Sequence, residues 1–137
     1  MVHTSAQVEK RTAQYIPGAC NIGRDEIRVR ALTGLAGLFI TAILLIILLI
    51  VHASPVIRVI VFIPAFISAL GFLQAYFHFC AYFGLRSLFN FEKAGTTPEE
   101  IWDDNMRRLD RRRAWTIIAY AALVAAGVTL VAFIIPF

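Results

Sequence analysis

Two thiols and one imidazole are the side chains of this sequence best suited to metal or redox chemistry. Cys20 and Cys80 are the two cysteines of the 137 residues, and His78 lies two positions before Cys80. Thiolate and imidazole are ligands that suit zinc, iron or copper. If the turn at residues 17–18 folds back against the His78 segment, a transition-metal or redox site could form, with a fourth ligand from His3, an acid or a second chain.

The spacing of His78 and Cys80 weighs against the simplest form of that site. Two residues that are two positions apart on an α-helix point about 200° apart, so both reach one ion only where the helix is distorted. A buried cysteine often serves as a small apolar residue, and an interfacial histidine as a hydrogen-bonding group. No acid, base and nucleophile can be combined with a workable geometry, so no catalytic residue is predicted and the cofactor stays unknown.

The composition indicates that these residues belong to a membrane protein. Hydrophobic residues make up 59% of the chain and charged residues 16%, and the mean hydropathy is +0.72. These values lie outside the range of soluble globular domains. The apolar segments contain no Asp or Glu, which disfavours an ion-coupled transporter, and no phosphate-binding glycine loop or zinc-protease motif is present.

Three apolar segments, residues 31–51, 55–83 and 114–135, are long enough to cross a bilayer. The second is interpreted as one long helix, because two spans would need roughly 40 apolar residues. We therefore predict an all-α membrane protein with three transmembrane helices. A polar N-terminal segment (1–30) precedes the transmembrane domain (31–137), and a loop and helical extension (85–113) precedes the third span. This extension is expected to begin at Thr97, a good N-cap before Pro98.

Arg58 and Pro64 interrupt the second apolar segment. Arg58 lies one turn from the start of the expected helix, so we predict that its side chain extends to the lipid headgroups, the alternative being a buried functional charge. Pro64 lacks an N–H group and is expected to bend the helix for reasons of packing.

Small residues recur at intervals of four in the first and third spans. Such residues allow helix backbones to approach closely in a membrane, so we expect the first and third helices to pack together. The remaining faces are then free for lipid, for a homo-oligomer or for a larger membrane complex. The residues of the two stripes are Thr33, Gly37 and Thr41, and Ala121, Ala125 and Thr129.

The basic residues predict the orientation. Five of the 13 precede the first span, seven lie between the second and third spans, and Arg58 alone lies near the opposite end. Positive residues favour the cytoplasmic side, so the N-terminus is expected inside and the C-terminus outside. Five arginines directly before the third span are expected to bind anionic lipid headgroups rather than nucleic acid. They are Arg107, Arg108, Arg111, Arg112 and Arg113.

Two segments carry a resemblance: YIPGACNIGRDEIRVR, and GFLQAYFHFCAYFG followed by FNF. With their CNIG and FHFC motifs, they resemble a family of small, uncharacterised bacterial membrane proteins. The resemblance implies a bacterial cytoplasmic membrane and no particular activity. We therefore expect a non-catalytic accessory or scaffold protein that acts at the cytoplasmic face. The alternative is a metal-binding or redox membrane protein that uses Cys20, His78 and Cys80.

Overall fold

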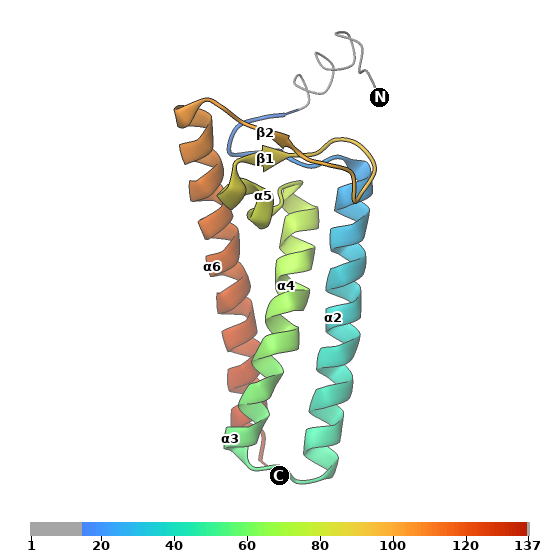
Figure 1. The fold of residues 1–137 in the computed structure, drawn as a ribbon. Coiled ribbons are helices and arrows are strands. Elements are labelled where there is room, and N and C mark those ends of the chain that lie inside the picture. Colours follow the sequence, from blue (N-terminus) through green and yellow to red (C-terminus); the bar gives the residue numbers. More distant parts are fainter. Residues whose placement is uncertain (1–14, 137) are drawn as a thin grey trace.

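The structure is a computed structural model that describes residues 15–136 (Figure 1). Two of its long helices are α2 (Arg24–Ile50) and α6 (Asp104–Ile134). The third is formed by α3 (Pro55–Arg58), the 3-10 turn η1 (Val59–Val61) and α4 (Phe62–Phe77) in succession. All three are long and apolar enough to cross a membrane. The predicted all-α membrane architecture with three spans is therefore confirmed.

A small polar layer covers one end of the three helices (Figure 1). It contains α5 (Ala81–Arg86) and two short strands, β1 (Leu88–Phe89) and β2 (Glu99–Glu100), which pair antiparallel. The segment before α2 also lies here, since Ile22 forms an isolated bridge with Asn90. We call residues 15–23 and 78–103 the cap.

The central helix of the bundle is α4, with α2 on one side and α6 on the other (Figure 1). The extensive helix contacts are those between α2 and α4 and between α4 and α6, whereas α2 and α6 share no extensive contact. The prediction that the first and third spans pack together is therefore wrong. Small residues predict which helix faces approach closely, but not which neighbour they meet.

Glycines bring α2 and α4 into backbone contact. A Cβ atom on Gly71 would lie 2.6 Å from the Gly34 nitrogen, and one on Gly37 would lie 2.9 Å from the Ser68 Cα. The Ser68 hydroxyl also donates a hydrogen bond of 2.8 Å to the Gly34 carbonyl. This interface therefore requires glycine at its closest points.

The predicted small-residue stripes both lie mainly toward the central helix. Gly37 and Thr41 are buried, but Thr33 is exposed, and buried Gly34 lies at the interface beside Phe72. On α6, three stripe residues are buried, and this helix packs on α3, η1 and α4. They are Ala121, Ala125 and Thr129.

The second span ends earlier than predicted. α4 stops at Phe77, and His78 adopts a left-handed conformation with φ 54°. Cys80 then becomes the N-cap of α5, so residues 55–83 are not one helix. The 3-10 turn η1 lies just before Pro64, which has no N–H to donate to the carbonyl four residues earlier.

The start of the third helix was also predicted wrongly. The N-cap is Asp103, whose carboxylate accepts a hydrogen bond of 3.0 Å from the Met106 N–H. Thr97 cannot begin the helix because Glu99 and Glu100 pair with β1. The competing strand pairing thus outweighs the local Thr-Pro helix signal.

Arg58 does not extend to the lipid headgroups, and that prediction is wrong. Its side chain is 1% exposed and donates hydrogen bonds to the carbonyls of Ala53, Ala132 and Ile135, at 3.1, 3.3 and 2.7 Å. The last two lie at the C-terminal end of α6, where free carbonyls carry partial negative charge. Arg58 therefore joins the second and third spans at the end of the bundle opposite the cap.

Candidate functional site

The structure brings the segments of the three predicted metal ligands together but turns their side chains to different partners. The Asn21 N–H donates to the His78 carbonyl at 3.3 Å, so the segment before α2 reaches the end of α4. Cys80 is buried, with its Sγ 3.2 Å from an Arg30 guanidinium nitrogen. Cys20 is half-buried, with its Sγ 3.7 Å from the Ile22 carbonyl oxygen, and His78 is exposed.

This arrangement gives little support to a metal centre. Among residues 15–136, no group of three or more His, Cys, Asp or Glu side chains could hold a metal ion, and His3 lies outside the described residues. The guanidinium of Arg30 places positive charge beside the Cys80 sulfur, where a metal cation would have to bind. Burial raises the pKa of the Cys20 thiol, which lowers its thiolate fraction. The metal alternative stays a prediction.

Asn21 holds together the break between α4 and α5. Its buried side chain donates to the Cys80 carbonyl at 3.1 Å and accepts from the Cys80 N–H at 2.7 Å. The Gln74 side-chain oxygen accepts from the Ala81 N–H at 2.8 Å. These bonds satisfy backbone groups that the end of a helix would otherwise leave unpaired.

A chain of polar contacts continues from this break to the β strands. Asn90 donates its side-chain N–H to Glu26 at 3.3 Å, and Glu26 forms an ion pair with Arg30 at 3.2 Å. The Asn90 backbone also bonds to the CNIG segment: its N–H donates to the Asn21 carbonyl, and its carbonyl accepts from the Gly23 N–H. The cap is thus connected directly to the start of α2.

Asp110 connects the cap to α6. Its buried carboxylate accepts hydrogen bonds from the Tyr15 hydroxyl and from the Gly18 N–H, the latter at 2.7 Å. The Tyr15 ring stacks on Phe89 with 5.0 Å between centroids, and burial and Asp110 raise the pKa of the Tyr15 hydroxyl. The sequence does not single out this acid, because its partners are more than 90 residues away.

The five arginines predicted to bind headgroups differ in their surroundings. Arg113 lies over the Phe77 ring at 4.4 Å, and Arg107 donates to the Ile101 carbonyl at 2.6 Å. Arg108, Arg111 and Arg112 are exposed. Three of the five therefore remain available to lipid at the cap end of α6.

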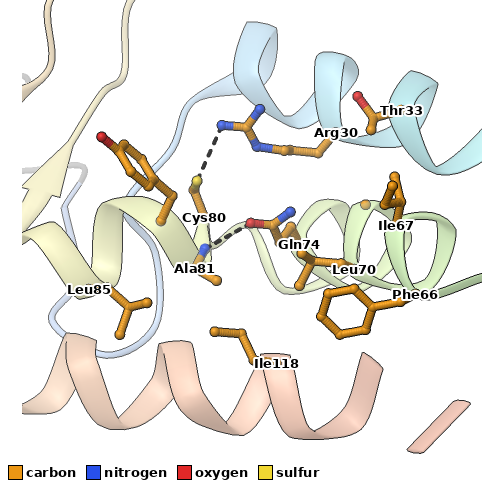
Figure 2. A pocket seen from close by; sticks show the side chains of 12 residues that line it. Arg30, Thr33, Phe66, Ile67, Leu70, Gln74, Cys80, Ala81, Leu85 and Ile118 are labelled. Atoms are coloured by element: carbon orange, nitrogen blue, oxygen red, sulfur yellow. Dashed lines mark hydrogen bonds between the residues drawn. The ribbon is translucent and has the colours of Figure 1, made fainter. Parts of the chain in front are cut away.

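A cavity of about 460 Å³ is lined mainly by α2 and α4, with further residues from α5 and Ile118 from α6 (Figure 2). Its walls are mostly apolar, but Arg30, Gln74 and Cys80 converge on its cap end. A second cavity of about 440 Å³ continues along α2 and α4, with Thr33 and Ile67 in the walls of both. Concave apolar sites with a few converging polar groups are typical of ligand pockets.

Comparisons with known proteins return no relative. The chain matches no protein-family model, no curated protein and no solved structure. The resemblance to small bacterial membrane proteins therefore stays a prediction. What this protein does has to be argued from the contacts of the described residues, and those contacts describe a three-helix membrane bundle with a polar cap at one end.

Proposed function

We propose that this protein is a non-catalytic accessory subunit that packs against a helix of a different membrane protein and holds its cap at the cytoplasmic face. The polar groups of the cap support a structural role. Asn21, Asn90 and Asp110 are all buried and bonded to other parts of the chain. Such groups rigidify the cap, and within residues 15–136 the hydrogen-bond partners of the two thiols, the Ile22 carbonyl and the Arg30 guanidinium, include no general base.

The observation that carries the proposal is a row of small residues on the outer side of α6. Ala119, Ala122 and Ala126 follow one another at intervals of three and four, and Ala119 and Ala126 are exposed. On a helix this spacing places them on one face, distinct from the buried residues that meet α4. Larger exposed residues, Trp115 and Phe133, lie at the two ends of the row.

A partner helix fits this face better than lipid alone does. Small residues let two helix backbones approach closely, and helix association in membranes depends on such packing. Beside Ala126, a hollow of about 290 Å³ is lined by Val59, Phe62 and Phe133, among others. A side chain from a neighbouring helix could fill this hollow.

The charges support a cytoplasmic cap. The cap and the adjoining ends of α2 and α6 carry almost all basic residues of the described chain, while Arg58 at the other end is buried. Positive residues are enriched on the cytoplasmic side of membrane proteins. The exposed Arg108, Arg111 and Arg112 would then face anionic headgroups.

Co-purification in a mild detergent tests the proposal. The Ala119→Leu variant adds bulk to the row of small residues and is expected to lose the partner that wild-type protein retains. Val124→Leu adds bulk to another exposed side of α6 and should retain it. Recovery of the wild type as a monomer, or only as a complex of identical chains, would contradict the accessory role.

A further inference from the structure

We propose that the protein binds one anionic phospholipid in the two adjoining cavities along α2 and α4, with the phosphate at Arg30 and Gln74 and one acyl chain along the groove. We call these cavities the α2–α4 groove. They share Thr33 and Ile67 in their walls, and their volumes are about 460 and 440 Å³. This proposal does not depend on the partner helix at α6.

The groove has the length that one acyl chain needs. From Arg30 to Leu44 it follows α2 for 14 residues, which corresponds to ~21 Å at 1.5 Å per residue. Half of the ~30 Å hydrocarbon core of a bilayer is ~15 Å. A chain that begins at Arg30 would therefore reach the middle of the membrane inside the groove.

The walls below Arg30 match a hydrocarbon chain and open towards the bilayer. Among residues 15–136, no charged side chain lines the second cavity, and several of its lining residues are exposed on the surface of the bundle. A lipid could therefore enter sideways from the membrane. The lining includes Ala36, Gly37, Ile40, Leu44, Ile60 and Ile63.

Gln74 supplies the observation that points to a polar ligand group. The residue is only 7% exposed, and its side-chain oxygen is held by the Ala81 N–H. Within residues 15–136 its side-chain nitrogen has no hydrogen-bond acceptor, and Figure 2 shows this nitrogen turned towards the space beneath Arg30. This nitrogen is accessible from the groove, and a donor that faces hydrocarbon without a partner costs free energy, so an oxygen of a bound ligand is the expected acceptor.

Arg30 supplies the positive charge at the same end of the groove. One guanidinium nitrogen contacts the Cys80 sulfur and Glu26, and the side chain is 22% exposed, so part of the guanidinium remains accessible from the groove. Arg30 is also the last charged residue of α2 before the apolar segment, the level at which phosphates meet hydrocarbon. The planar fork of donors on an arginine suits phosphate oxygens, and this favours an anionic phospholipid over a neutral amphiphile.

Native mass spectrometry of the delipidated full-length protein in detergent at pH 8 tests the proposal. Phosphatidylglycerol, phosphatidylcholine with the same acyl chains, and palmitate are titrated separately. Arg30→Gln removes the charge, and Gln74→Glu keeps the acceptor for the Ala81 N–H while replacing the free donor by an oxygen. The matched control is Arg28→Gln, which removes an exposed arginine from the same turn of α2.

The expected result is one tightly bound phosphatidylglycerol per chain. Phosphatidylcholine has the same phosphate but also a choline cation, which Arg30 repels, so it should bind about tenfold more weakly. Arg30→Gln and Gln74→Glu should each weaken the binding of phosphatidylglycerol by a similar factor, and Arg28→Gln should change its affinity by no more than about twofold. Ile67→Trp, which fills the groove without changing a charge, should abolish the one-to-one complex.

Three results would overturn the assignment. The first is equal binding of the two phospholipids, and the second is binding of palmitate alone. The third is an equal loss of phosphatidylglycerol affinity in Arg28→Gln and Arg30→Gln, which would indicate general attraction to the basic surface. Circular dichroism and the melting temperature identify a variant that fails to fold, and the isosteric Gln74→Glu variant and the groove-filling Ile67→Trp variant then decide between the outcomes.

Discussion

Replacing Asn21 by Ala should destabilise the protein more than any other single truncation of an amide side chain in the cap. The side chain is fully buried and bonds to both backbone groups of Cys80. The Cys80 N–H lies between the end of α4 and the start of α5 and would lose its partner, whereas the Cys80 carbonyl would keep the bond that it accepts from the Gly84 N–H at 2.9 Å. The perturbation therefore affects one junction while leaving the long helices intact.

The size of the effect follows from one buried N–H left unpaired and one further hydrogen bond lost at the Cys80 carbonyl. A buried donor without a partner costs about 1–3 kcal/mol and a lost hydrogen bond about 1 kcal/mol, so the free energy of unfolding should fall by about 3 kcal/mol. For a chain of this size, 1 kcal/mol corresponds to about 4 °C in the melting temperature, and the variant should melt about 12 °C lower.

The assay is thermal unfolding in detergent, followed by a dye that becomes fluorescent when it reacts with a thiol. A Cys20→Ser background leaves Cys80 as the single reporter, and Cys80 is only 1% exposed in the folded protein. Asn105→Ala, the same substitution at an exposed position of α6, is the matched control and should shift the midpoint by no more than about 2 °C.

The reasoning would be refuted if Asn21→Ala had the same melting temperature as the Asn105→Ala control and if its Cys80 reacted as slowly as in the Cys20→Ser background. Such a result would mean that the junction between α4 and α5 does not depend on Asn21.

Three further changes test other parts of the fold. Arg58→Met should lower the free energy of unfolding by about 3 kcal/mol in the same assay, because the carbonyls at the end of α6 lose a charged donor, and a variant as stable as wild type would exclude that role. Gly71→Val should separate α2 from α4 and lower the melting temperature, since its Cβ would lie 2.6 Å from the Gly34 nitrogen. Gly127→Ala lies in open space and should raise the free energy of unfolding by about 0.5–1 kcal/mol. The reverse order of the two melting temperatures would contradict this packing. Because burial raises the pKa of the Cys20 thiol, its maleimide reaction rate should keep rising with pH after that of a free thiol has levelled off, and a curve that follows the free thiol would disprove the burial.

The three spans could be predicted from the sequence because the bilayer imposes one simple requirement, a sufficient length of apolar helix. The small residues also indicated which faces approach closely, but lipid is as apolar as a leucine side chain, so no hydrophobic pattern distinguishes one helix neighbour from another. The pairing of Gly37 with Ser68 and the burial of Ala121 beside the central helix therefore became visible only in the structure.

The cap could not be predicted because its contacts join distant parts of the chain. Asn21 and Cys80 are 59 residues apart. α4 ends at Phe77 because His78 adopts a left-handed conformation, which the residue type does not predict. Apolar composition continues through this break and conceals it. The sequence did identify the CNIG and FHFC segments as notable, but for metal chemistry rather than for the hydrogen bonds that they make.

The most direct test of the proposed accessory role is photo-crosslinking in the native membrane, with a photoreactive amino acid at position 126 and, as the control, at position 124 on another exposed side of α6. The proposal predicts an adduct with a different membrane protein at position 126, greatly reduced by Ala119→Leu and absent at position 124. Lipid adducts alone at both positions, or an adduct only with a second copy of the chain, would contradict it.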